Sequence, residues 1–375
     1  MNIVYVSNSI IPSKYANSIH VMKMCNAFSQ NSHNVFLLAR RGSWLNTRDL
    51  HKRYGVTNIF PIIFCWRPNF LPRLWRENIY STGLCRAVKK LILKDMKPDL
   101  LYGRYEHGLF ALSKYFDIPF VFETHDTPAR SKDVFYVQEA LLKQKNLLAL
   151  VCISDQLKQE YIRVFPWFPK EKIIVVHDGS DLPEETVPGE ILDWPGRTGC
   201  IQVGYVGHLY PGKGMEIIAQ IFRQLPNLDF HIIGGMEKDI EFWKSKCRGS
   251  NIFFHGYIWQ EKLSSYIKRL DIVLAPFPAQ GKYSRWSSPL KIFDYMAWRK
   301  PIVASDIPMV REILIDGQNA VLVSPENIDE WIKTLEYLAK DSAYRDNLAQ
   351  CAYQTLKDKY TWKVRAQNIL NSLCL

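Results

Sequence analysis

Two segments in the second half of the chain place glycine and lysine residues where a helix is expected to begin. The apolar run IQVGYVG from residue 201 leads through HLYPGKG into MEIIAQIFRQL, whose apolar side chains recur on one helical face. This pattern predicts a helix that starts near Gly214, with its unpaired amide groups and positive dipole end next to Lys213. A diphosphate is the ligand that such a geometry favours. The alternative is an ordinary glycine-rich turn with a lysine in solvent.

The segment SSPLKIFDYMA at 287–297 predicts a second helix start. Ser287 or Ser288 is a suitable cap, Pro289 suits the first helical position, and apolar residues follow at helical spacing. Both helix starts could therefore face one anion. Asp294 would lie roughly 8 Å along the axis from the capped end, where its carboxylate could accept both hydroxyls of a ribose. The alternative is an acid on a helix surface.

The first half of the chain offers a histidine at the end of a predicted strand. The run PFVFE leads into Thr-His-Asp at 124–126, and open α/β sheets bind ligands at the carboxyl ends of their parallel strands. We therefore expect His125 to face a ligand-binding cleft, although a structural histidine in a loop is the alternative. Arg104 follows the run LLYG, where it could meet a phosphate of a ligand or could be an ordinary surface arginine.

Short apolar, β-branched runs alternate with helix-length segments, and these elements must position the residues above. The alternation predicts parallel sheets that are covered by helices on both faces. Seven runs precede residue 180 and six follow residue 200, which predicts two doubly wound α/β domains at 1–180 and 200–358. The segment 181–199 holds three prolines, three glycines and several acids without periodicity, which suits a linker. Residues 359–375 are expected to form a helix that returns to the first domain.

Composition agrees with two folded domains in a reducing compartment. At 375 residues and 47% hydrophobic, the chain exceeds what one core usually supports. Its eight cysteines include no CxxC pair, and residues 1–13 lack the features of a signal peptide, so a cytoplasmic location is expected. The absence of Asp-x-Asp and His-Glu-x-x-His motifs favours a metal-free site. The absence of GxGxxG argues against a dinucleotide oxidoreductase.

The net charge of +11 is concentrated in one basic region that is rich in aromatic residues. Between Arg40 and Lys97, thirteen Lys or Arg residues stand against three acids. Attraction to an anionic membrane surface explains this mixture of cations and large apolar side chains. A solvated basic face above core aromatics is the alternative, and nucleic-acid binding is disfavoured because no recognised motif accompanies the charge. The large apolar residues are Trp44, Phe60, Phe64, Trp66, Phe70, Leu71, Leu74 and Trp75.

Several of these motifs together resemble one enzyme family. The matching pieces are FETHD, ISDQLKQEYI, KIIVVHDGSD, GYVGHLYPGKG, NIFFHGYI, LDIVLAPF and SSPLKIFDYMAWRKPIVASDIP. In their order and spacing, along nearly the whole chain, they resemble family-4 retaining glycosyltransferases of the GT-B fold, of the bacterial surface-polysaccharide type. The resemblance implies an α/β protein with two Rossmann-like domains facing across a cleft and a C-terminal helix that packs back on the first domain.

The resemblance also implies a donor site in the second domain. Lys213 would bind the donor diphosphate, Asp294 would hold the ribose, and the backbone amides of Leu290 and Lys291 would approach the phosphates. The turn at 256–258 would border the base. The full set of implied donor-binding residues is Gly207, His208, Lys213, Tyr257, Ile258, Ser288, Leu290, Lys291 and Asp294.

The chain departs from the family pattern at two of these positions. His208 stands where the family usually has arginine, five residues before the lysine, so diphosphate neutralisation is expected to rest more heavily on Lys213. Trp286 stands where the first acid of the Glu-x7-Glu pattern usually touches the donor sugar, and only the second acid is kept, as Asp294. We interpret Trp286 as a change in sugar recognition, with loss of activity as the alternative.

On the acceptor side, the resemblance gives His125 a catalytic role beside the reacting carbon, where it would orient the sugar or stabilise charge. Glu123 and Asp126 are its expected neighbours. The segment SNSIIPSKYANSIH matches the family's acceptor loop in position and precedes a helix expected at 21–28, which makes Asn17 and His20 candidates for acceptor contact. Arg104 and Asp126 are the other two candidates for acceptor binding.

The expected function is transfer of a hexose from a UDP- or GDP-hexose to a lipid-linked or polysaccharide acceptor at the inner face of the cell membrane. Residues 40–97 would contact the anionic membrane, and neither a cofactor nor a metal would be needed. The acceptor hydroxyl would attack on the face that the nucleotide leaves, and the leaving phosphate would take the proton. The alternatives are a sugar-nucleotide epimerase or phosphorylase on the same fold and a non-catalytic membrane-bound scaffold.

Overall fold

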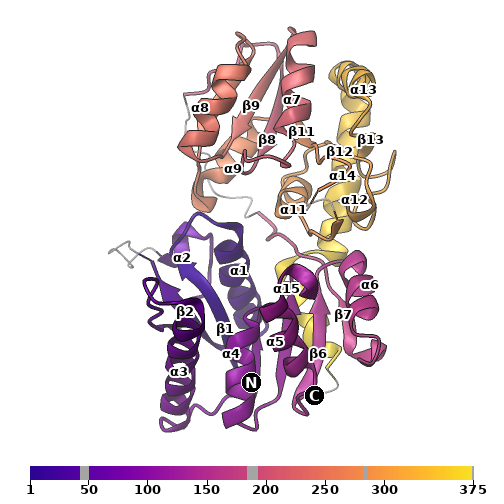
Figure 1. Cartoon of the computed structure of the whole chain (residues 1–375). Helices are drawn as coiled ribbons and strands as arrows, with labels where there is room; N and C mark the ends of the chain where they lie inside the picture. Colours follow the sequence, from indigo (N-terminus) through magenta and orange to yellow (C-terminus); the bar gives the residue numbers. More distant parts are fainter. Residues whose placement is uncertain (43–49, 184–192, 282–284, 374–375) are drawn as a thin grey trace. The chain divides into compact units, whose positions relative to one another are not determined.

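The computed structural model describes residues 1–42, 50–183, 193–281 and 285–373, and Trp44 therefore lies outside the described residues. The chain divides into two compact units. The first unit comprises Met1–His177 and Trp362–Leu375, and the second comprises Asp178–Thr361. Each unit is a parallel sheet with helices, and Figure 1 labels most of these elements.

The first unit contains a seven-stranded sheet in the order β3-β2-β1-β4-β5-β6-β7, in which every pair is parallel. Residues 3–6, in the interior strand β1, are fully buried, as expected for a parallel sheet covered on both faces. Its strands are β1 (Asn2–Ile11), β2 (Asn34–Arg41), β3 (Ile62–Phe64), β4 (Leu100–Gly103), β5 (Phe120–Thr124), β6 (Leu147–Cys152) and β7 (Ile173–Val175). Its helices are α1 (Ala16–Gln30), α2 (Leu50–Arg53), α3 (Arg73–Ile92), α4 (Glu106–Tyr115), α5 (Lys132–Leu142), α6 (Asp155–Val164) and α15 (Trp362–Asn371).

The last helix, α15, belongs to the first unit, although the whole second unit separates the two in the sequence. It packs against α1 and buries Trp362, Arg365, Ala366 and Ile369. These residues recur at spacings of three and four and so share one helical face. The expected return of the C-terminal helix to the first domain is therefore present in the structure.

The second unit contains a six-stranded parallel sheet in the order β10-β9-β8-β11-β12-β13. Its strands are β8 (Ile201–Val206), β9 (Leu228–Ile233), β10 (Ile252–Gly256), β11 (Ile272–Ala275), β12 (Ile302–Ser305) and β13 (Val321–Val323). Its helices are α7 (Met215–Ile221), α8 (Glu237–Lys246), α9 (Gln260–Lys268), α11 (Leu290–Ala297), α12 (Pro308–Arg311), α13 (Ile328–Lys340) and α14 (Ser342–Lys359).

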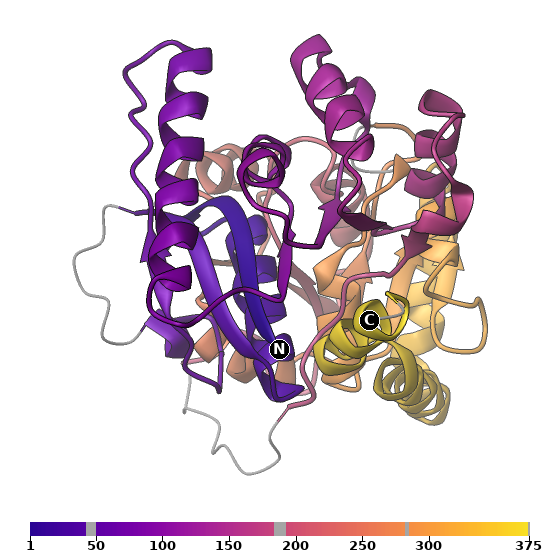
Figure 2. The ribbon, with the colours of Figure 1, turned by 90° about the horizontal axis from the view of Figure 1, so that it is seen from below.

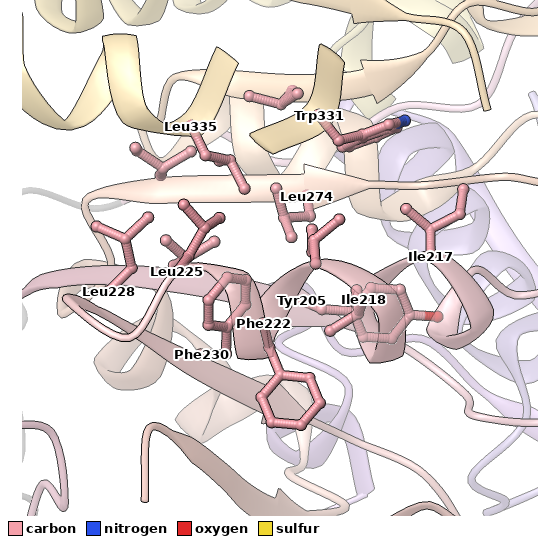
Figure 3. Close-up of a cluster of buried hydrophobic side chains, with 14 of the residues drawn as sticks. Tyr205, Ile217, Ile218, Phe222, Leu225, Leu228, Phe230, Leu274, Trp331 and Leu335 are labelled. Atoms are coloured by element: carbon pink, nitrogen blue, oxygen red, sulfur yellow. The ribbon is translucent and has the colours of Figure 1, made fainter. Parts of the chain in front are cut away.

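A buried apolar cluster fixes α7 on the second sheet. Figure 3 shows Ile218 of α7 and Trp331 and Leu335 of α13 around Leu274 of β11, and all four side chains are at most 1% exposed. Burying one such side chain contributes about 1.5–3 kcal/mol. The loop that precedes α7 is therefore attached to a well-packed helix.

Within the described residues, no helix is both long and apolar enough to span a membrane.

Candidate functional site

The loop between β8 and α7 needs glycine at both of its ends. Gly207 has φ 148° and Gly214 has φ 101°, which are conformations that other residues rarely adopt. A Cβ on Gly214 would also lie 1.6 Å from the carbonyl oxygen of Pro276. Gly214 is the N-cap of α7, so the helix begins where the sequence predicted it.

The side chain of Tyr205 in β8 contacts this loop through hydrogen bonds. Its hydroxyl lies 2.8 Å from the carbonyl oxygen of His208 and 2.9 Å from that of Lys213, which fixes both ends of the segment between them. The face of the same ring lies 3.7 Å from Nζ of Lys291, close enough for a cation–π interaction. Tyr205 therefore positions two lysines at once, one through its hydroxyl and one through its ring.

Lys213 and Lys291 are two partly buried lysines that repel each other, and the Nζ atom of Lys291 is enclosed. Burial lowers the pKa of Lys213 to about 8. Burial, and then repulsion from Lys213, hold the pKa of Lys291 well below its ordinary value. Two ammonium groups that repel each other away from water are unfavourable unless an anion joins them. The sequence predicted Lys213 as a phosphate ligand, but it assigned only the backbone amide of Lys291 to this site.

Helix α11 begins at Leu290 with Pro289 as its N-cap, and no side chain caps it. The prediction that Ser287 or Ser288 caps this helix, with Pro289 as its first residue, is therefore wrong. The hydroxyl of Ser288 instead accepts a hydrogen bond from the backbone N–H of Asp178 at 2.8 Å. A serine hydroxyl can accept a hydrogen bond from any backbone N–H group that the fold brings close. Here that group belongs to Asp178 and not to the first turn of α11.

Asp294 lies on α11 with its carboxylate half-buried. One oxygen accepts a hydrogen bond from the Ser180 hydroxyl at 2.7 Å. A carboxylate has about four acceptor positions, so this group can accept further hydroxyls. The position suits the ribose contact that the resemblance implied.

The remaining donor candidates lie in loops of the second unit, after β8, after β10 and before α11. Tyr257 and Ile258 follow β10 and are half-buried, and the ring of Tyr257 lies edge-on to Trp259 at 5.3 Å. The ring of His208 stacks on Tyr210 with 5.4 Å between centroids. Trp286 is half-buried, and the guanidinium of Arg285 lies 5.9 Å from its ring.

In the first unit, a buried carboxylate joins residues from four elements. Glu123 of β5 is fully buried. Its Oε1 accepts a hydrogen bond from Nε2 of His125 and lies 2.9 Å from Nε2 of His20. Its Oε2 accepts hydrogen bonds from the Tyr102 hydroxyl and, at 3.1 Å, from Nη1 of Arg365.

The charge of Arg365 keeps Glu123 ionised. Burial by itself would raise the pKa of the Glu123 carboxyl, but attraction to Arg365 and His20 and hydrogen bonds from His125 and His20 hold it well below its ordinary range. Nε of Arg365 also donates to the carbonyl oxygen of His177 at 2.8 Å. The sequence did not predict this arginine. The feature of the sequence that could have indicated its role is the position of a charged residue among the apolar residues on one face of the last helix.

His125 is neutral and has a defined tautomer. Burial, followed by repulsion from Arg104, lowers the pKa of His125 to about 3. An ionised carboxylate can only accept, so Nε2 of His125 carries the proton that is donated to Glu123, and Nδ1 keeps its lone pair. His125 can therefore orient a hydroxyl by accepting its hydrogen bond, and its lowered pKa disfavours the imidazolium form at neutral pH.

The acceptor candidates are only partly brought together. Helix α1 begins at Ala16, earlier than the helix expected at 21–28, so Asn17 and His20 lie on the helix and not in a loop. Asn17 is exposed, whereas His20 is buried beside Glu123 with its ring edge-on to His125 at 4.6 Å.

The two other acceptor candidates are half-buried. Arg104 follows β4, and one carboxylate oxygen of Asp126 accepts from the Thr127 backbone N–H at 2.9 Å. Their role in acceptor binding stays a prediction.

Three of these side chains could also bind a metal ion. His20, Glu123 and His125 each offer a ligand atom, and these atoms lie within 4.8 Å of one another. The carboxylate is already engaged by the guanidinium of Arg365, which supplies the positive charge that a metal would bring. That the enzyme needs no metal stays a prediction.

Two family models match the two halves of the chain. The model described as Glycosyltransferase Family 4 matches residues 18–184, and the model described as Glycosyl transferases group 1 matches residues 201–341. The chain belongs to glycosyltransferase family 4. This membership makes the protein a glycosyltransferase, as the sequence motifs indicated.

Similar proteins extend over most of the chain. A glycogen synthase of Mycobacterium tuberculosis is 23% identical over 304 residues, which cover 73% of this chain and 68% of that protein. The structure of Anabaena Alr3699/HepE in complex with UDP-glucose matches with a TM-score of 0.74 at 15% identity, over 100% of this chain and 99% of that one. The lipopolysaccharide outer core galactosyltransferase WaaB matches with a TM-score of 0.67 at 16% identity, over 100% and 99%. These structural matches and the two parallel sheets show the GT-B fold.

Proposed function

We propose that this glycosyltransferase moves a hexose from a nucleotide diphosphate sugar to a lipid-linked or saccharide acceptor in cell-surface glycan synthesis, with retention of configuration at the anomeric carbon. The observation that carries the proposal is the pair of buried ammonium groups, Lys213 and Lys291, beside the glycine-bounded loop of the second unit. A diphosphate is the kind of ligand that two neighbouring lysine side chains bind through charge-assisted hydrogen bonds.

The donor is proposed to be a UDP-hexose. The HepE structure, which shares the fold, was determined with UDP-glucose, and Asp294 offers a carboxylate for ribose hydroxyls. A GDP-hexose is the main competitor, because the turn at Tyr257 and Ile258 that would border the base has no side chain diagnostic of one nucleotide. The sugar itself depends on Trp286 and its surroundings.

The proposed reaction needs no carboxylate nucleophile. The bond from the anomeric carbon to the diphosphate oxygen breaks, and a bond to the acceptor oxygen forms on the same face. The acceptor proton passes to the departing phosphate oxygen. The two lysines would stabilise the charge that grows on the leaving group, which is the kind of contribution that usually dominates such a step. Neutral His125 would orient a hydroxyl through Nδ1.

A cluster of exposed apolar side chains supports membrane contact by the first unit. The exposed apolar cluster consists of Trp66, Phe70, Leu74 and Trp75, which are between 65% and 80% exposed. Trp66 and Phe70 precede α3, and Leu74 and Trp75 lie in its first turn. The rings of Trp66 and Phe70 are 6.4 Å apart. Phe60, which the sequence grouped with them, is buried and contributes to the core instead.

Helix α3 extends this cluster with positive charge. Two arginines near the cluster are paired, Arg67 with Glu77 and Arg73 with Asp133. Farther along α3, the long helix at the edge of the first unit in Figure 2, Arg86, Lys89 and Lys90 are exposed, and Lys94, just after the helix, is exposed as well. Apolar insertion by the cluster and attraction by these cations are the two contributions that hold a protein on an anionic bilayer. We therefore propose that the enzyme is peripheral on the cytoplasmic face of the membrane.

Donor binding and turnover test the enzymatic proposal. Thermal shift with UDP, GDP, ADP and their hexoses should show stabilisation by one nucleotide, because a ligand that binds only the folded state raises its stability by mass action. Incubation of that sugar nucleotide with a lipid-linked acceptor should give an α-linked product from an α-linked donor. An inverted product would remove the retaining mechanism, and donor isomerisation without acceptor would point to an epimerase.

Vesicle binding tests the membrane proposal separately. The protein should sediment with vesicles of phosphatidylcholine and phosphatidylglycerol, and less with phosphatidylcholine alone or at high salt. Changing both Trp66 and Trp75 to serine should reduce binding, whereas the control Tyr115→Ser, at an equally exposed aromatic on α4's last position, should not. Equal binding by both variants would remove the exposed apolar cluster from the proposal.

A further inference from the structure

The ammonium group of Lys291 is buried, and no described residue accepts a hydrogen bond from it. Its surroundings are the ring faces of Tyr205 at 3.7 Å and Phe277 at 5.3 Å. Aromatic faces attract a cation but do not replace the hydrogen bonds that an ammonium makes in water. A lysine held in this way reduces the stability of the protein unless a ligand compensates it.

The position of Lys291 on its helix directs this group towards the glycine-bounded loop. Lys291 is the second residue of α11, and helical side chains point back towards the N-terminus of their helix. A Cβ on Gly207 would lie 3.2 Å from Nζ of Lys291, so the glycine leaves room for the ammonium. The uncapped first-turn amides of α11 lie at the same end of the helix.

His208 is a weaker cation than the arginine that the family usually has at its position. His208 occupies the place where the family usually has arginine, and its ring stacks on Tyr210. We propose that the side chain of Lys291 supplies the second cation of the diphosphate site, in place of the arginine that His208 replaces. This inference rests on the proposed function, because it concerns the donor that the proposed reaction consumes.

Donor binding should then draw protons into the site. The titratable groups that face Lys291 are Lys213, which repels it, and the phenol of Tyr205, whose pKa is raised by burial so that it stays neutral. A bound diphosphate would raise the pKa of both lysines. The protein should therefore take up protons when it binds the nucleotide, which a purely structural lysine would not cause.

The test is titration calorimetry with UDP, and with uridine as a ligand without phosphate. Lys291→Met should weaken UDP binding about 10- to 100-fold, as expected for loss of a charge-assisted hydrogen bond. It should leave uridine binding unchanged and should reduce the proton uptake measured in buffers of different ionisation enthalpy. Because the variant loses a buried amine that has no hydrogen-bond partner, its melting temperature should be equal to or higher than that of the wild type.

Lys300→Met is the matched control. Lys300 is also a largely buried lysine of the second unit, but its Nζ donates to the carbonyl oxygens of Lys268 at 3.0 Å and Leu270 at 2.6 Å. Its loss should lower the melting temperature and leave UDP affinity unchanged. Lys291→Gln, which keeps a polar side chain, repeats the test if Lys291→Met does not fold.

The outcomes separate the inference from the proposed function. If the wild type binds none of UDP, GDP and ADP, the proposed function fails at its first step. If the wild type binds UDP and Lys213→Met weakens it, while Lys291→Met and Lys291→Gln bind UDP as the wild type does, Lys291 is not a diphosphate ligand and the inference alone is overturned. If GDP or ADP is the nucleotide bound, the same titrations are made with it.

Discussion

Replacing Arg365 by methionine should destabilise the first unit strongly. Arg365 is fully buried, it pairs with the buried carboxylate of Glu123 at 3.1 Å, and it donates to the carbonyl oxygens of His177 and Val176. Removing one partner of a buried ion pair costs about 3–5 kcal/mol, because the other charge stays buried without compensation. For a domain of this size, that corresponds to a fall in melting temperature of roughly 6 to 20 °C.

The loss of stability caused by Arg365→Met should depend on pH, and the protonation of the Glu123 carboxyl determines the direction of that dependence. In the wild type its pKa is lowered, so the stability it contributes is present above the unfolded pKa and is lost as pH falls through the folded pKa. In Arg365→Met, burial is no longer opposed by the guanidinium, and the pKa of Glu123 should rise. Protonation then removes the uncompensated charge, so the gap between variant and wild type should be narrower at pH 5 than at pH 8.

Urea unfolding at both pH values measures this effect, and hydrogen exchange at β5 and α15 identifies the transition that belongs to the first unit. Lys363→Met is the control, because Lys363 is an exposed residue of the same helix and its loss should change stability by at most about 0.5 kcal/mol. The double variant Arg365→Met with Glu123→Gln should recover part of the loss. A cost below about 1 kcal/mol for Arg365→Met, an equal cost at both pH values, or strict additivity in the double variant would refute the reasoning.

Three further predictions concern the site. Gly214→Ala should abolish donor binding and lower the melting temperature, because its Cβ would collide with the Pro276 carbonyl oxygen, and thermal shift with UDP checks both effects. His125→Gln should lower kcat. The wild-type pH profile of kcat/KM should show no ionisation of His125 between pH 6 and 8, because burial lowers the pKa of His125 to about 3. An ionisation in that window that disappears in the variant would contradict this prediction. Extensive dialysis against EDTA should leave activity unchanged, and recovery of lost activity by one divalent metal would overturn the metal-free mechanism.

Local sequence patterns were sufficient for the elements of both sheets. A parallel strand buried on both faces requires a continuous apolar, β-branched run, so runs such as IVYVS and DIVLAPF mark β1 and β11 without reference to the rest of the chain. The start of α7 was equally local, because the left-handed conformation at Gly214 favours glycine. The order of the motifs was enough to indicate the family.

Contacts between distant polar groups depended on the tertiary structure. Arg365 and Glu123 are separated by 242 residues, and they become partners because α15 packs against α1 in the fold. The hydroxyl of Ser288 was available to cap α11, but the fold brought the backbone of Asp178 to it. The sequence shows which side chains carry charge, whereas burial and partners decide which of those charges are stabilised and which, like that of Lys291, are left for a ligand.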